Sequence, residues 1–221
     1  MIIKDTDEAL WEETETGVRH QSRPTHNYLL LMTAGGAIAA TGFLSTPPTQ
    51  TIAFISASVI APGFEPLAKV PIGLGLGRWR TALRGLRSAL IGYVLIVVAA
   101  ALAYVLLEAT GATTLRNFLD NKEIDKLSNP ISLDILVSSA AAVAGVVMLA
   151  TRRFALLAGP LMALALIPSA AMAGVAAVAG EGKLVVQGLE RLAIDVGLIL
   201  VLGLIVVILK QAFVHRRRPF P

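Results

Sequence analysis

The sequence predicts an all-α integral membrane protein with six transmembrane spans in two inverted three-span repeats. Three observations carry this prediction. Hydrophobic residues make up 55% of the 221 residues and charged residues only 15%, with a mean hydropathy of +0.72. Two long apolar segments, residues 50–77 and 154–180, are each interrupted by proline and glycine. Basic residues gather between alternate apolar segments, as they do in the cytoplasmic loops of membrane proteins.

The first half of the chain begins with a polar stretch, residues 1–26, which contains six carboxylates. We predict an acidic cytoplasmic tail there and no cleavable signal peptide, whose first region is short and positively charged. The first three-span repeat is predicted over residues 27–107. Its spans are Tyr28–Leu44, Thr51–Gly77 with a break around Ala61–Pro66, and Ser88–Leu107.

A basic amphipathic stretch precedes the third span, and we predict that it lies on anionic lipid headgroups. Its arginines are Arg78, Arg80, Arg84 and Arg87. A polar linker, residues 108–131, then separates the two halves on the extracytoplasmic side.

The second three-span repeat is predicted over residues 132–210. Its spans are Ser132–Ala150, Phe154–Ala179 with a break near Pro168, and Val185–Leu209. Residues 211–221 form a basic cytoplasmic tail, whose side chains are expected to contact lipid headgroups. The arginines of this cluster are Arg216, Arg217 and Arg218.

Two topologies fit the interrupted segments. As single crossings they give six spans, whereas as re-entrant hairpins they give four spans and two hairpins. With six spans and a cytoplasmic N-terminus, twelve Lys and Arg residues lie inside and five outside. The hairpin topology cannot place the basic clusters at residues 78–87 and 216–218 on one side. We therefore favour six spans in the cell membrane, with both termini cytoplasmic. An odd number of spans per repeat inverts the second repeat.

A weak internal register supports the repeats, at an offset of 103 residues. Gly77 then falls on Gly180 and Gly85 on Gly188, while Pro66 lands one residue after Pro168.

The segment Ser58–Pro66, with the sequence SVIAPGFEP, resembles the DUF389 family of hydrophobic membrane domains. The glycine-rich run Ile72–Gly77 and the Ile167-Pro168-Ser169 triplet are similar to two further motifs of that family. The resemblance covers about residues 27–210. It departs at Glu65, where the family has glycine, and it implies that the interrupted segments are shared family features.

Glu65 and Lys69 form the sharpest candidate site, because they lie four residues apart directly after the first break. A charge at membrane depth costs several kcal/mol unless it is paired or hydrated. One interpretation is an ion or solute site in which Glu65 is the ligand or proton acceptor. The other is a mutually neutralised pair that stabilises the broken helix.

Asp195 lies about ten residues into the last span. It is interpreted either as a cavity-facing carboxylate for a cation or proton, or as the partner of Arg191 in a local ion pair. The first interpretation is favoured, since a base four residues before an acid is the weaker orientation on a helix.

The breaks themselves supply further candidate ligands. Helix N-termini at Pro66 and Pro168 favour an anion. The carbonyls left unpaired at Ile60–Pro62, next to Gly63, and at Leu166–Ile167 favour a cation. The hydroxyl of Ser169 could add a neutral ligand, although bonding to its own helix is the more common role. The sequence leaves the sign of the substrate open.

The sequence offers no catalytic motif. It has no cysteine, and its three histidines, His20, His26 and His215, lie near the ends. We expect no enzymatic activity, no cofactor, no bound metal and no nucleic-acid partner. Small residues spaced four apart, such as Ala170 and Gly174, suit close helix packing within the chain or in a homo-oligomer.

These observations predict a membrane transport protein that moves a small ion or solute through a midplane site at two broken helices. The alternative is a sensor or scaffold that does not transport, and that binds lipid or a partner protein through its basic segments.

Overall fold

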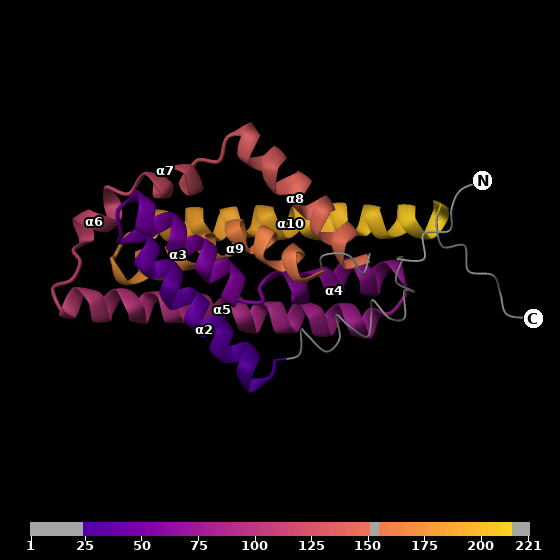
Figure 1. Ribbon diagram of the computed structural model, residues 1–221, viewed down its shortest axis with the longest axis horizontal. Helices are drawn as coiled ribbons and strands as arrows, with labels where there is room; N and C mark the ends of the chain where they lie inside the picture. The colour runs from indigo at the N-terminus through magenta and orange to yellow at the C-terminus, as the bar shows by residue number, and fades with distance from the viewer. Residues whose placement is uncertain (1–23, 151–154, 214–221) are drawn as a thin grey trace, which may run out of the picture.

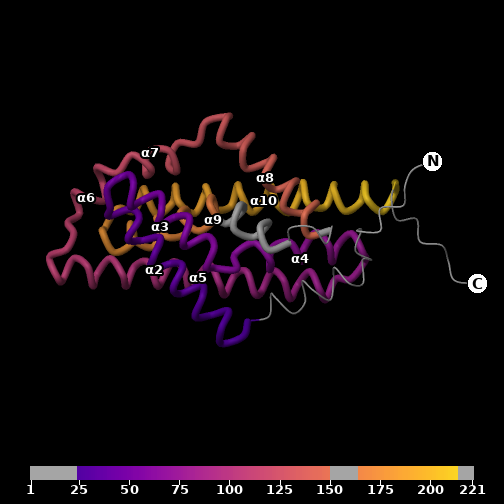
Figure 2. Tube along the Cα trace, in the orientation of Figure 1, coloured from indigo at the N-terminus to yellow at the C-terminus, as the bar shows by residue number. Residues whose placement is uncertain are grey.

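The computed structural model describes residues 24–150 and 155–213, in which every regular element is an α-helix. Figure 1 and the Cα trace of Figure 2 show their arrangement. The helices are α2 (His26–Phe43), α3 (Pro47–Ile60), α4 (Phe64–Gly75), α5 (Trp79–Ala109), α6 (Leu115–Leu119), α7 (Lys122–Ser128), α8 (Ser132–Ala150), α9 (Ala155–Val178) and α10 (Gly182–Phe213).

Three described helices, α5, α8 and α10, are long and apolar enough to cross a membrane. The pair formed by α3 and α4 meets the same test as one unit, bent by 48° at the residues between them. These apolar helices indicate a membrane protein, and the described residues hold three of them, or four when the bent pair counts as one span. Helix α2 stays outside this group, because its 18 residues begin with His26 and Asn27 and include three glycines.

The two longest helices, α5 and α10, run in opposite directions along the length of the molecule (Figure 1). Helix α9 packs against both, α2 and α4 pack against α5, and α8 packs against α10. One end of the molecule carries α6, α7 and the turn between α2 and α3, and the last turns of α4 and α10 lie toward the other end (Figure 1).

Glycines allow the close helix contacts that membrane proteins favour. A Cβ added to Gly174 of α9 would lie 2.2 Å from the carbonyl oxygen of Val97 in α5, and one added to Gly36 of α2 would lie 2.6 Å from that of Ile96. Ala170, one turn before Gly174, is fully buried. The predicted small-residue face on α9 therefore packs within the chain.

The predicted break in the second span is present. Helix α3 ends at Ile60 and α4 begins at Phe64, two residues before the predicted start at Pro66. Ala61 has φ −85° and ψ 119°, the extended conformation that a residue before proline prefers. Pro62 thus explains why α3 ends where it does.

The predicted break near Pro168 is wrong, since α9 is one continuous helix through that residue. Proline in a helix removes one backbone hydrogen bond, which membrane helices tolerate when neighbouring helices enclose the site. Ile167, Ser169 and Ala170 are all fully buried, so neighbouring helices enclose this turn of α9.

The basic stretch before the third predicted span is not a separate helix. Trp79 begins α5, which continues without interruption to Ala109, so Arg80, Arg84 and Arg87 lie on its first turns with exposed side chains. Arg78 is exposed just before the helix. The predicted cluster at residues 216–218 and the acidic tail before residue 24 lie outside the described residues.

Local geometry recurs at the offset of 103 residues. Gly77 and Gly180 follow α4 and α9 with φ values of 69° and 79°, conformations that favour glycine. The amide of Arg78 donates to the carbonyl of Gly73, and the amide of Glu181 donates to that of Ala176.

The packing of the following helices recurs as well. A Cβ on Gly85 of α5 would lie 2.6 Å from the carbonyl oxygen of Pro66, and one on Gly188 of α10 would lie 3.0 Å from that of Ser169. The helices α4 and α5 therefore meet through the same positions as α9 and α10.

Candidate functional site

The break between α3 and α4 is enclosed by three other helices. The hydroxyl of Tyr93 in α5 donates to the carbonyl of Gly63 at 3.1 Å. Ile167 of α9 lies 3.8 Å from the position of a Cβ on Gly63, and Gly35 of α2 packs against Ala61. Non-helical backbone inside a membrane protein requires such surroundings, because lipid cannot satisfy its polar groups.

Glu65 is the second residue of α4 and follows this break directly. Its Oε2 atom is enclosed and has no hydrogen-bond partner. The adjacent Phe64 and the nearby Leu67 are almost fully buried. Tyr28 and Tyr93 lie close enough to feel its charge.

Lys69 lies one turn further along α4 and is 4% exposed. The stem of its side chain packs against α5, where a Cβ on Gly85 would lie 2.7 Å from the Lys69 Cβ. The ammonium group does not donate to Oε2 of Glu65, which accepts no hydrogen bond. Energetic coupling between the two residues stays a prediction.

The sequence context favoured a poorly paired Asp195, but the structure pairs it with Arg191. Arg191 Nε lies 3.1 Å from Asp195 Oδ2, and the two side chains are only 6% and 2% exposed. Arg191 Nη2 also donates to Ser138 Oγ of α8 at 2.9 Å. The guanidinium group thus joins α10 to α8 instead of pointing outward, and sequence spacing had given no sign of Ser138.

This buried pair is incompletely satisfied. Asp195 Oδ1 and Arg191 Nη1 are both enclosed without a hydrogen-bond partner. The charge of Asp195 acts on Tyr93, which also feels the charge of Glu65. Tyr93 therefore lies within electrostatic range of both carboxylates.

Sequence reasoning missed Tyr93 and Tyr28, because an aromatic residue in an apolar helix is usually a packing residue. The feature that could have identified them is the hydroxyl group of tyrosine, which needs a hydrogen-bond partner when it is buried. Tyr28 donates to the carbonyl of Ser88 at 2.9 Å and so joins α2 to α5.

The remaining predicted residues lie in two places. Pro62, Gly63 and Pro66 are at the break and its first helical turn. Pro168 and Ser169 lie inside α9, where the Ser169 hydroxyl donates to the carbonyl of Ala165 in its own helix. Ile167 brings this part of α9 against the break.

A family profile described as "Domain of unknown function (DUF389)" matches residues 58–202, which include the break, Glu65 and the Arg191–Asp195 pair. The chain therefore belongs to the DUF389 family. Searches of curated proteins and of solved structures found no match.

Proposed function

We propose that this DUF389 protein moves a cation or a proton across the cell membrane through a site at the α3–α4 break. The observation that carries the proposal is Glu65, whose Oε2 atom is enclosed without a hydrogen-bond partner beside non-helical backbone. An ionised carboxylate in such a place costs several kcal/mol, and a bound cation or proton removes that cost.

The position of Glu65 on α4 favours a positive substrate. The N-terminus of a helix carries a partial positive charge and attracts anions. Here the carboxylate of Glu65 already occupies the first turn of α4. An anionic substrate would meet this carboxylate, whereas a cation would be attracted by it.

The proposed architecture has six spans in two inverted three-span repeats. Helices α5 and α10 contain 31 and 32 residues and run in opposite directions (Figure 1). The matched glycines and backbone bonds at an offset of 103 residues support the repeats. A bend of 48° between α3 and α4 favours a continuing crossing over a hairpin, which would reverse direction.

In this proposal the Arg191–Asp195 pair holds α10 against α8, and Glu65 is the group that binds the substrate. The sensor or scaffold alternative is supported by the exposed arginines on the first turns of α5, Arg80 and Arg84 among them. Those side chains suit anionic lipid under either function. Flux through the purified protein distinguishes the two.

The test is ion flux in proteoliposomes that contain the full chain, with imposed gradients of H⁺, Na⁺ and K⁺ and, for comparison, Cl⁻. We expect flux of at least one cation well above that of empty vesicles, and a loss of more than tenfold in Glu65→Gln. The matched control is Glu190→Gln, because Glu190 is an exposed carboxylate on α10. It should retain wild-type flux.

Two results would overturn the proposal. One is the absence of flux for every cation in a protein that elutes as a single folded species. The other is wild-type cation flux in Glu65→Gln, which would remove the carboxylate from the pathway.

A further inference from the structure

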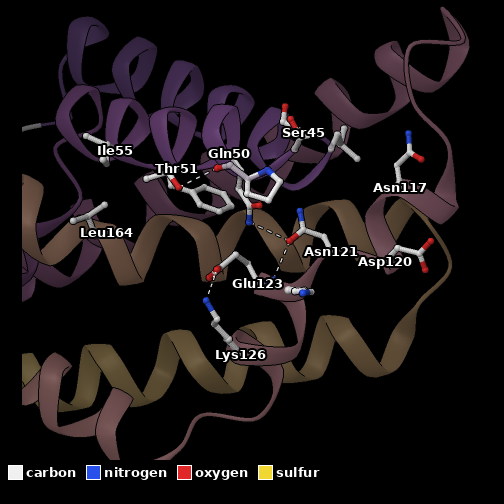
Figure 3. Close-up of a pocket in the computed structure, with 15 residues that line it drawn as sticks. Ser45, Gln50, Thr51, Ile55, Asn117, Asp120, Asn121, Glu123, Lys126 and Leu164 are labelled. Atoms are coloured by element: carbon white, nitrogen blue, oxygen red, sulfur yellow. Dashed lines mark hydrogen bonds and ion pairs between the residues drawn. The ribbon is translucent and has the colours of Figure 1, made fainter.

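An open cavity lies between α3 and the short helices α6 and α7, at the end of the molecule that carries the linker (Figure 3). Its volume is about 870 Å³, within the range of sites for small organic molecules. Its lining includes neither the α3–α4 break nor Glu65, so it is separate from the proposed transport site.

The lining changes from polar to apolar along α3. Gln50 and Thr51 line the cavity near the start of the helix, and Phe54 and Ile55 line it one turn further on, together with Leu164 of α9. Five residues of helix correspond to roughly 7 Å along its axis. Ile55 is 48% and Leu164 40% exposed, so the apolar part opens onto the outer surface of the molecule.

The polar rim carries two lysines and two carboxylates, so its formal charges balance. Lys122 and Lys126 both line it, with Glu123 and Asp120. Lys126 donates to Glu123, which raises the pKa of the lysine, and Asp120 lies 3.4 Å from Arg116. Each carboxylate of the rim thus has a basic partner, Lys126 for Glu123 and Arg116 for Asp120. Lys122 is the charged group of the rim that neither of these ion pairs uses.

The rim is held in place by Asn121. Its side chain accepts from Gln50 Nε2 at 3.1 Å and caps α7 by accepting from the amide of Glu123 at 2.9 Å (Figure 3). It also donates to the carbonyl of Phe43 at 2.9 Å. The N-terminus of α3 also reaches the rim, where Thr46 makes no side-chain cap. The partial positive charge of this helix N-terminus favours an anion.

We propose that this cavity binds a membrane phospholipid. The phosphate of the headgroup lies at the polar rim beside Lys122, and one acyl chain lies over Phe54, Ile55 and Leu164. A free phosphate would leave the apolar half of the cavity unfilled, and an alkane would leave the charged rim unmatched. A phospholipid satisfies both halves, and the polar-to-apolar direction along α3 follows the path from membrane interface to hydrocarbon.

The test is tryptophan quenching by lipid in bilayers that contain the full chain. Trp11 and Trp79 are replaced by phenylalanine, and Ile55→Trp then reports on the apolar part of the cavity. Leu189→Trp is the matched reporter, because Leu189 is 46% exposed and lies a similar number of residues from the same end, on α10. Dibrominated phosphatidylglycerol is titrated into phosphatidylcholine. If Ile55→Trp does not fold, Leu164→Trp replaces it.

We expect half-maximal quenching of Ile55→Trp at a several-fold lower fraction of brominated lipid than for Leu189→Trp. One lysine near an anionic surface contributes about a fivefold preference, so Lys122→Gln should remove most of the difference. Lys183→Gln is the control, since Lys183 begins α10 at the same end without lining the cavity. It should leave the difference unchanged.

Identical quenching curves for the two reporters would overturn the proposal. So would an unchanged preference in Lys122→Gln. If inorganic phosphate at millimolar concentration abolishes the preference, the rim is a site for a free anion and the lipid assignment is wrong. Each of these results is independent of ion flux through the Glu65 site.

Discussion

Neutralising Asp195 should unfold the protein more easily, although Asn keeps the shape of the side chain. The Asp195→Asn substitution removes the negative partner of Arg191, whose side chain is only 6% exposed. A buried ion pair that loses one partner costs about 3–5 kcal/mol, because the remaining charge is left uncompensated. Arg191 keeps its hydrogen bond to Ser138, which places the expected loss toward the lower end of that range.

The chain supplies a matched control in the exposed pair formed by Arg116 and Asp120. Arg116 and Asp120 have the same residue types, order and spacing, with a distance of 3.4 Å between Arg116 Nε and Asp120 Oδ2. Their side chains are 88% and 71% exposed, so water screens the charges. An exposed pair of this kind contributes about 0.3–0.5 kcal/mol, and Asp120→Asn should cost no more than that.

The assay is reversible unfolding of the purified chain in mixed micelles, followed by circular dichroism, which yields the free energy of unfolding. A double-mutant cycle with Arg191→Met and Asp195→Leu completes the test. Each single change should be strongly destabilising, and the double change should recover a large part of the loss, since no charge is then left alone. Equal and small effects of Asp195→Asn and Asp120→Asn would refute this reasoning and return Asp195 to a hydrated cavity.

The other predictions concern topology and helix packing. Cysteine introduced at Lys122 should react with an impermeant reagent on intact cells and cysteine at Arg84 should not, because the proposed six spans place them on opposite sides; equal labelling would contradict the proposed topology. Gly174→Ala should destabilise the protein by about 1–3 kcal/mol, since the new methyl group would lie 2.2 Å from a backbone oxygen of α5. Gly197→Ala, with nothing within 4 Å, should be neutral or stabilising by up to about 1 kcal/mol in the same unfolding assay; a similar effect of the two changes would argue against the close contact of α5 and α9.

The sequence predicted helix bounds correctly where one residue determines the backbone conformation of its neighbours. The predicted span Ser132–Ala150 has the bounds of α8, and the break at Ala61–Gly63 follows from the effect of Pro62 on the residue before it. Pro168 gave the same signal and no break, because its effect depends on which helices enclose it. That information lies in the fold and is absent from the local sequence.

The candidate site shows the same division between local and distant information. Glu65 could be identified from the sequence, because an ionisable side chain deep in an apolar segment is costly and usually has a functional or structural role. Its neighbours across the break, Tyr93 and Ile167, come from other helices and had no signal of their own. Likewise the spacing of Arg191 and Asp195 suggested a pair, but the hydroxyl that completes it comes from Ser138, 53 residues away.

The proposed repeats also explain why one half is the better place to look for the substrate. At an offset of 103 residues Glu65 corresponds to Pro168, and Asp195 corresponds to Gly92. The glycines that bring the helices together match in the two halves, whereas these ionisable residues do not. Packing therefore accounts for what the halves share and gives no reason for a carboxylate at Glu65. Asp195 Oδ1 and Glu65 Oε2 both lack a hydrogen-bond partner, but Arg191 lies 3.1 Å from Asp195 Oδ2 and supplies a charge partner within the chain. Under the proposed function, a bound cation or proton offsets the cost of the charge on Glu65.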